Sequence, residues 1–315
     1  MPPTSEAIVF PGQGAQYSGM GKAWADAFPV ARAIFERADR ILGFALSETM
    51  WQEGEETVSR TDVAQPAILT TSVAIVSVLT DRGLDPTSAS LTAGLSLGEY
   101  TALWCAGSLA FEDALRLVRL RGEAMQAASE ATPSSMISLM GADLTTAEAL
   151  AKVGSEQGIC AVANQNAPGQ IVLSGELAAL EAVEAAARSH GIKRAVRLQV
   201  AGGFHSECMR PAAERLAAAL AETTVSPPRM PFLSNVTGEP LADPDEIKEA
   251  LARQVCSPVL WEKSMRAMVA DGFDTFLEPE PGKVLAGLLR KIDPSVTALA
   301  LDAAWQGLSR GEKAS

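Results

Sequence analysis

The feature that most constrains this chain is the segment Gly94-Leu95-Ser96-Leu97-Gly98, which matches the pattern G-x-S-x-G. In that pattern a serine stands on a tight turn between a strand and a helix. An apolar stretch, Leu91 to Ala93, precedes the segment, and a helical pattern begins at Glu99. The glycines allow a sharp turn, and the helix N-terminus supplies free backbone N–H groups beside the hydroxyl. The sequence therefore predicts a nucleophilic serine, Ser96, on a strand–turn–helix elbow.

Composition narrows the class of protein. The chain has 315 residues, 47% of them apolar, and a formal net charge of −12. These values indicate a globular protein with a sizeable core, and they argue against nonspecific binding to nucleic acid or to an anionic membrane. Four scattered cysteines and two histidines predict reduced thiols and no metal site. We find no signal peptide and no apolar stretch near the ~20 residues of a spanning helix, so we expect a cytoplasmic protein.

The order of predicted elements divides the chain into two domains. Residues 131–198 read as strand, helix, strand, strand, helix, strand, which is the ferredoxin-like βαββαβ arrangement. The chain on either side reads as α/β. We therefore predict an α/β fold in which a large α/β-hydrolase-like domain, residues 1–130 and 199–315, carries the small ferredoxin-like domain 131–198 as an insertion.

A nucleophilic serine needs a base, and the chain offers two histidines. His190 stands at the end of a polar helix, where an exposed histidine is expected. His205 lies in the loop Ala201-Gly202-Gly203-Phe204-His205-Ser206, between the last strand of the small domain and the next helix. Catalytic groups concentrate on such loops. We therefore predict that His205 is the base for Ser96.

The loop after the first strand is a second candidate site element. Its Pro11-Gly12-Gln13-Gly14 run satisfies neither the phosphate-loop pattern nor G-x-G-x-x-G. Enzymes with a G-x-S-x-G serine take a second oxyanion-binding N–H from a loop after another strand. We interpret this loop as that element.

Five motifs occur together and in order, and together they resemble one family, the malonyl-CoA:acyl-carrier-protein transacylases of fatty-acid and polyketide synthesis. The resemblance covers the chain from Ala7 to about Leu301. The motifs are Phe10-Pro11-Gly12-Gln13-Gly14-Ala15-Gln16, Gly94-Leu95-Ser96-Leu97-Gly98-Glu99-Tyr100, Arg121-Gly122-Glu123-Ala124-Met125-Gln126, Phe204-His205-Ser206 and Pro281-Gly282-Lys283-Val284-Leu285.

The resemblance implies catalytic roles at five positions. Ser96 is the acylated nucleophile, and His205 is its base and later its acid. The backbone N–H groups of Gln13 and Leu97 form the oxyanion hole. Gln254 matches the position whose main chain orients the histidine.

It also implies substrate-binding roles. Arg121 pairs with the free carboxylate of the malonyl group, for which a planar guanidinium is well suited. Phe204 resembles the residue of malonyl-selective members, because a large side chain there crowds an α-methyl group. Asn166 and Asn235 fall in loops that match the family's active site.

The implied partners are malonyl-CoA and a holo acyl carrier protein, with no cofactor beyond the coenzyme A of the substrate. Carrier proteins of this kind are acidic, so docking to this acidic chain requires a local basic patch. We expect Lys193 and Arg194 to contribute to it. We expect a monomer.

Two positions depart from the family pattern. Leu95 stands where many members have histidine, and Glu280 replaces a glycine that usually precedes Pro281-Gly282. Fatty-acid synthesis is the first interpretation. Three alternatives remain at this point: a stand-alone acyltransferase of a polyketide pathway, an editing acyl-hydrolase with the same serine and histidine, and a noncatalytic scaffold.

Overall fold

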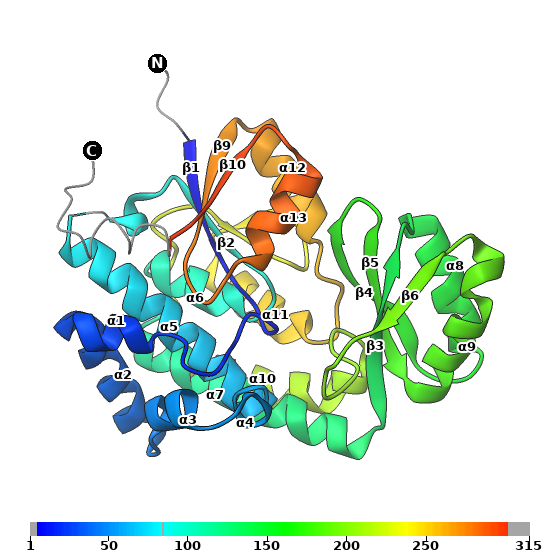
Figure 1. Cartoon of the computed structure of the whole chain (residues 1–315), viewed down its shortest axis with the longest axis horizontal. Coiled ribbons are helices and arrows are strands. Elements are labelled where there is room, and N and C mark those ends of the chain that lie inside the picture. Colours follow the sequence, from blue (N-terminus) through cyan, green and yellow to red (C-terminus); the bar gives the residue numbers. More distant parts are fainter. Residues whose placement is uncertain (1–4, 84, 302–315) are drawn as a thin grey trace.

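The computed structural model describes residues 5–83 and 85–301 and has two α/β parts (Figure 1). The larger part is built on a six-stranded sheet with strand order β10-β9-β1-β2-β7-β8, in which every pair is parallel except the antiparallel pair β7–β8. Its strands are β1 (Ser5–Phe10), β2 (Leu91–Gly94), β7 (Phe232–Leu233), β8 (Pro240–Leu241), β9 (Phe273–Glu278) and β10 (Thr297–Ala300).

Helices bury both faces of this sheet, as the unbroken apolar run in β1 requires. Ile8 and Phe10 pack with the helices of one face, and Ala7 and Val9 pack with those of the other. The first face carries α1 (Lys22–Ala27), α2 (Pro29–Leu42), α3 (Leu46–Gln52), α4 (Glu55–Val58), α5 (Thr61–Asp81), α6 (Gly98–Cys105), α7 (Phe111–Ala131), α10 (Arg210–Ala221) and α11 (Pro244–Gln254). The second face carries α12 (Trp261–Ala270) and α13 (Val284–Ile292).

The smaller part has its own sheet and its own core. Its antiparallel strand order is β4-β5-β3-β6, which is the ferredoxin-like order, and its two helices pack on that sheet through a separate apolar cluster. The elements of this domain are β3 (Ser134–Met140), α8 (Leu144–Ser155), β4 (Cys160–Ala167), β5 (Gln170–Glu176), α9 (Leu177–Ala187) and β6 (Arg194–Arg197). Elsewhere and between these elements, the described residues form the single-turn 3-10 helices η1 (Pro86–Ser88), η2 (Arg188–His190) and η3 (Glu207–Met209). All six elements of this small domain lie within 131–198. The ends of the large domain, 1–4 and 302–315, lie outside the described residues.

We expected no stretch with the length and composition of a membrane-spanning helix, and helix α5 contradicts that expectation. It is 21 residues long and passes that test, but 89% of its most apolar window is buried inside the fold. Its apolar character is explained by its position in the core of the large domain, between α2 and α7 (Figure 1).

Helices α5 and α7 cross closely, and this crossing positions part of the site. A Cβ atom on Gly122 of α7 would lie 2.6 Å from the backbone oxygen of Thr61, so only glycine fits there. Pro66 lacks the N–H that would bond to the carbonyl of Asp62. That carbonyl instead accepts a hydrogen bond of 2.7 Å from Arg119 Nη1 of α7. The two helices are therefore fastened at the turn that carries Gln65 and Arg121.

Glu280, one of the two departures from the family pattern, joins three segments. Its carboxylate accepts hydrogen bonds from Trp24 Nε1, at 2.7 Å, and from the hydroxyl of Tyr17. Its backbone oxygen accepts a hydrogen bond of 3.0 Å from Ser72 Oγ of α5. The acidic side chain thus ties the β9–α13 loop to the loop that follows β1.

Candidate active site

Three central strands of the large sheet end at the same edge, and each leads into a loop with a predicted site residue. β1 leads to Gln13, β2 leads to Ser96 and β7 leads to Asn235. Because these strands are parallel, their carboxyl ends bring the three loops together. The edge of the large sheet therefore supplies one half of the site.

Ser96 stands on a constrained turn. Its φ is 51°, a left-handed conformation that non-glycine residues rarely adopt. Helix α6 starts two residues later, and a Cβ atom on Gly98 would lie 2.2 Å from the backbone oxygen of Phe10. The turn is also held from the side by Asn235, whose Oδ1 accepts from Ser96 N at 2.6 Å and whose Nδ2 donates to the oxygen of Gly94 at 2.7 Å.

His205 is in contact with the serine hydroxyl. Its Nε2 lies 2.9 Å from Ser96 Oγ, and its Nδ1 lies 2.8 Å from the backbone oxygen of Gln254. A carbonyl can only accept, so Nδ1 carries the proton and Nε2 presents its lone pair to the hydroxyl. Burial, and next the charge of Arg121, lower the pKa of His205 to about 4. The imidazole is therefore neutral near pH 7 and able to take the serine proton.

Arg121 lies on the other side of the hydroxyl. Its Nη2 donates to Ser96 Oγ at 3.0 Å and to Gln254 Oε1 at 2.9 Å, and its Nη1 donates to Gln65 Oε1 at 2.8 Å. Only 1% of this arginine is exposed, and its Nε has no hydrogen-bond partner among the described residues. The site therefore holds a buried positive charge with unused donor capacity directly beside the nucleophile.

A cavity of about 290 Å³ opens onto these three residues between the two domains. Phe204 and Asn166 line it, as does Asn164, and the buried Oδ1 of Asn166 has no partner in the described structure. Residues 198–200 follow β6 and form part of the wall. Asn235, predicted as a substrate-binding residue, is not part of the cavity lining: both ends of its amide bond to the elbow backbone, so its side chain holds the turn.

The two predicted oxyanion donors come from two different loops, Gln13 from the loop after β1 and Leu97 from the elbow after β2. Gln13 lines the cavity, and Leu97 directly precedes the first turn of α6. Neither backbone N–H donates a hydrogen bond to any described residue. Both donors remain available to an oxyanion.

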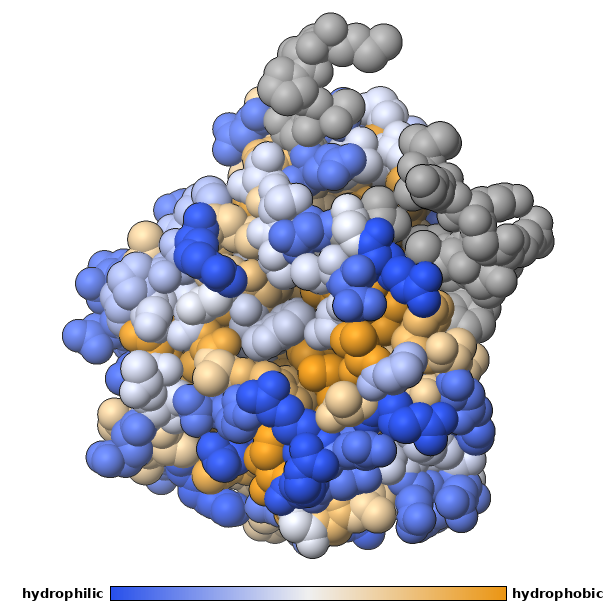
Figure 2. Space-filling model, turned by 90° about the vertical axis from the view of Figure 1, so that its left-hand side faces the viewer, coloured by the Kyte–Doolittle hydropathy of each residue, from blue (hydrophilic) through white to orange (hydrophobic). Residues whose placement is uncertain are grey.

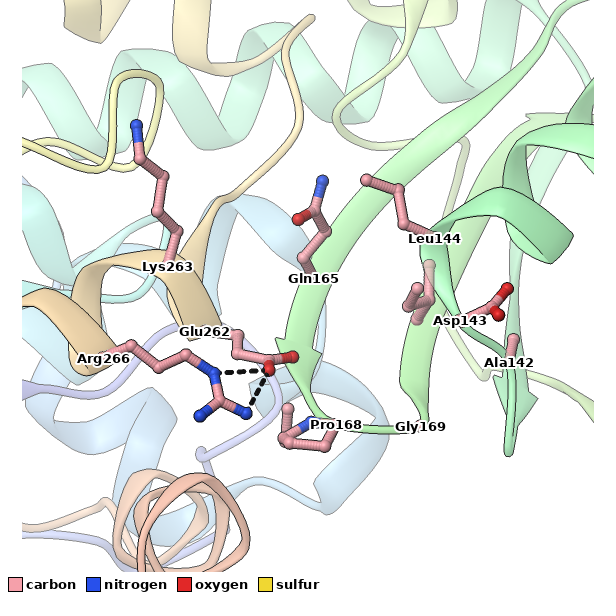
Figure 3. A pocket seen from close by; sticks show the side chains of 11 residues that line it. Ala142, Asp143, Leu144, Gln165, Pro168, Gly169, Glu262, Lys263 and Arg266 are labelled. Atoms are coloured by element: carbon pink, nitrogen blue, oxygen red, sulfur yellow. Dashed lines mark hydrogen bonds and ion pairs between the residues drawn. The ribbon is translucent and has the colours of Figure 1, made fainter.

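A second hollow lies away from this chemistry. It has a volume of about 540 Å³ and lies between α12 and the strands of the small domain. Figure 3 shows Arg266 of α12 paired with Glu262 at its edge, where the Nε–Oε1 distance is 2.8 Å. None of the predicted site residues lines it. Among residues 5–83 and 85–301, no group of three His, Cys, Asp or Glu side chains could hold a metal ion.

Sequence analysis missed two polar residues at the site, Gln65 and Glu99. Gln65 is fully buried in the apolar helix α5, where a lone amide is itself a signal of a polar contact. Glu99, in the first turn of α6, is also fully buried and accepts from Asn235 N at 2.6 Å and from Gln254 Nε2. In the sequence Glu99 looks like an ordinary acidic residue at a helix start.

A serine and a neutral histidine in contact at the carboxyl edge of a parallel sheet define the class of serine-dependent acyl-transfer enzymes. Residues 7–294 match the acyl transferase domain. The malonyl CoA-acyl carrier protein transacylase of Bacillus subtilis is 42% identical over 299 residues, which cover 94% of this chain and 92% of that protein.

Solved structures agree with this match. The acyl-carrier-protein-S-malonyltransferase of Bartonella henselae is 38% identical with a TM-score of 0.92, covering 97% of this chain and 99% of that one. A malonyl-transacylase in complex with a type II PKS acyl-carrier protein is 37% identical with a TM-score of 0.92, covering 98% and 100%. The chain belongs to the malonyl CoA-acyl carrier protein transacylases.

Proposed function

We propose that this protein transfers a malonyl group from malonyl-CoA to the phosphopantetheine thiol of an acyl carrier protein, through a malonyl ester on Ser96. One observation carries the proposal: Ser96 Oγ lies between the acceptor nitrogen of His205, at 2.9 Å, and a guanidinium nitrogen of Arg121, at 3.0 Å. This arrangement activates a hydroxyl beside a fixed positive charge, as transfer of a carboxylated acyl group requires.

The first half-reaction acylates the enzyme. Ser96 Oγ attacks the thioester carbonyl carbon of malonyl-CoA while His205 Nε2 takes the hydroxyl proton. The carbonyl oxygen becomes an oxyanion that accepts from the N–H groups of Gln13 and Leu97. When the carbon–sulfur bond breaks, coenzyme A leaves as a thiol with the proton that His205 returns.

The second half-reaction runs the same steps in reverse. The carrier thiol gives its proton to His205 and attacks the ester carbonyl. The bond to Ser96 Oγ then breaks, and the serine regains its proton from the imidazolium. Arg121 holds the malonyl carboxylate throughout, and the bulk of Phe204 in the cavity wall favours malonyl over methylmalonyl. The reaction uses the chain's own groups, and coenzyme A enters only as part of the substrate.

Fatty-acid synthesis in the cytoplasm is the setting that we propose. A polyketide pathway is the alternative, because a similar structure is bound to a type II PKS carrier. Figure 2 shows apolar areas among hydrophilic side chains on one face of the protein. We propose a monomer, because Ser96, His205 and Arg121 of a single chain already make up the contact on which the reaction depends.

Product analysis tests the function. Purified enzyme is mixed with malonyl-CoA and holo carrier protein, with apo carrier as the control, and malonyl-carrier and free malonate are both measured. The proposal predicts malonyl-carrier only with the holo form. Free malonate in place of malonyl-carrier would support an acyl-hydrolase, and no turnover would support a scaffold.

The pKa of His205 predicts an unusual pH profile for acylation. The base acts in its neutral form, so kcat/KM for malonyl-CoA falls when His205 becomes protonated. Because that pKa is lowered to about 4, we expect nearly constant kcat/KM from pH 7.5 down to pH 5.5 or so, where a histidine with a pKa of about 6.5 would lose most of it. Rapid-quench acylation across this range measures the profile, and an acidic limb near pH 6.5 would contradict the account.

We predict that Lys193 and Arg194 contribute to docking of the carrier protein. Both are exposed at the start of β6, an edge strand of the small sheet. We expect the double charge reversal Lys193→Glu/Arg194→Glu to slow transfer to the carrier most strongly at low salt, because opposite surface charges steer association. Acylation by malonyl-CoA should be unchanged.

The matched control reverses two exposed arginines of α2, Arg32→Glu/Arg40→Glu, which changes the net charge equally. It should leave both half-reactions intact. Equal losses in the two double variants, or a loss of acylation in the first, would reject this docking surface.

A further inference from the structure

Glu99 is a buried carboxyl that the proposed reaction does not use. It is the second residue of α6 and is fully buried. One of its oxygens accepts from the backbone N–H of Asn235 at 2.6 Å, and the other accepts from Gln254 Nε2. No lysine or arginine among the described residues forms an ion pair with it. Both carboxyl oxygens therefore face N–H donors.

Its second partner, the Gln254 amide, faces different groups on its two sides. The nitrogen donates to Glu99 and, at 2.9 Å, to the backbone oxygen of Ser96. The oxygen accepts from Arg121 Nη2 at 2.9 Å. An amide can turn by 180° at almost no change in shape, so its neighbours decide which atom faces which group. Glu99 and Ser96 are the acceptors that keep the nitrogen away from Arg121.

We infer that Glu99 is a positioning residue that fixes the orientation of the Gln254 amide, and through it the guanidinium of Arg121 that selects a carboxylated acyl group. The inference rests on the proposed roles of Ser96 and Arg121. Glu99 does not line the cavity and touches no substrate. Its action on selectivity passes through Gln254.

Burial and mutual interaction act in opposite directions on Glu99 and Arg121. Burial raises the pKa of Glu99 to about 8, and the hydrogen bonds from Asn235 and Gln254 and the charge of Arg121 oppose that rise. Burial also lowers the pKa of Arg121, whereas Tyr100 and Glu99 raise it. The two hydrogen bonds and the charge of Arg121 thus offset part of the cost of burying the Glu99 carboxylate, and Glu99 offsets part of the cost of burying Arg121.

The substitution Glu99→Gln tests the inference, because a glutamine must present an NH₂ group to one of two donors. The N–H of Asn235 belongs to the backbone and cannot turn away. The new amide therefore keeps its oxygen for Asn235 and turns its nitrogen to Gln254. Gln254 must then rotate or withdraw, and in both cases Arg121 Nη2 loses Gln254 Oε1 as an acceptor, while Gln65 and Ser96 still accept from the guanidinium.

The measured quantity is the ratio of the acylation rate constants for malonyl-CoA and acetyl-CoA. Intact-protein mass spectrometry monitors the formation of each acyl-enzyme over time. A hydrogen bond to a charged group corresponds to about a tenfold change or more, so we expect the ratio to fall about tenfold in Glu99→Gln. Glu278→Gln is the matched control. Glu278 is also buried, at 1% exposure, and accepts from two backbone N–H groups, but these belong to the first turn of α13 and not to Gln254 or Asn235. It should lower thermal stability and leave the ratio unchanged.

Two further results test the inference. Glu99→Gln should have no additional effect on the ratio in a Gln254→Ala background, because the amide through which it acts is absent. Glu99→Asp, which keeps both acceptor oxygens, should retain more of the ratio than Glu99→Gln. If Glu99→Gln does not fold, as judged by circular dichroism, the Glu99→Asp and Gln254→Ala ratios carry the test.

An unchanged ratio in folded Glu99→Gln, or equal effects with and without the Gln254 amide, would overturn the inference. A wild-type protein that forms no malonyl adduct would instead overturn the proposed function. The two failures are therefore distinguishable.

Discussion

Replacement of Ser96 by alanine is expected to abolish the malonyl adduct and to reduce transfer to the carrier by at least about 10⁴-fold. The substitution removes the atom that forms the ester, and it leaves His205, Arg121 and both oxyanion donors in place. Intact-protein mass spectrometry after mixing with malonyl-CoA measures the first effect, and malonyl-carrier formation measures the second.

Ser59→Ala is the control, because this exposed serine lines the same cavity but does not contact His205. It should acylate at the wild-type rate. A malonyl adduct that persists in Ser96→Ala would show that another group is the nucleophile.

Replacement of Arg121 by alanine should remove the preference for a carboxylated acyl group. A carboxylate that is held by two charge-assisted hydrogen bonds loses about 1.5–3 kcal/mol for each bond, which corresponds to a fall of about 10²-fold or more in acylation by malonyl-CoA. Acylation by acetyl-CoA should fall much less, and hydrolysis of uncharged acyl groups is expected to rise. The malonyl-to-acetyl ratio of acylation rate constants is the measurement.

Two variants sharpen this test. Arg121→Lys keeps the charge without the planar fork, so its ratio should lie between those of the wild type and Arg121→Ala. Arg116→Ala removes an exposed arginine of the same helix that pairs with Asp113, and it should leave the ratio unchanged. Equal losses for malonyl-CoA and acetyl-CoA in Arg121→Ala would mean that the guanidinium supports the fold of the site and does not select the acyl group.

Local sequence was sufficient where the backbone itself defines the function. The turn at Ser96 needs glycines at fixed offsets, and the loop at His205 follows a strand, so both could be found from short patterns. The small domain could be outlined for the same reason, because its strands and helices follow one another with clear turn residues. The family resemblance then located Arg121 and Gln254, whose helices give no local sign of a shared contact.

Residues whose roles depend on packing between distant elements were less predictable. Gln65 reaches Arg121 only because α5 and α7 cross closely at Gly122. Glu99 resembles a solvated residue of a first helical turn until the fold covers it. For Asn235 the predicted loop lies at the site, but the direction of its side chain is set by the backbone of the elbow. Sequence analysis placed Asn235 near the site without showing what it contacts, and it assigned no role to Gln65 or Glu99.

The most direct test of the account is isolation of the acyl-enzyme. Enzyme mixed with malonyl-CoA and freed of small molecules is digested to locate the adduct, and a parallel sample is chased with holo carrier protein. The account predicts one malonyl group on Ser96 that is stable in buffer and moves to the carrier. An adduct on another residue, or one that decays to malonate and ignores the carrier, would contradict it.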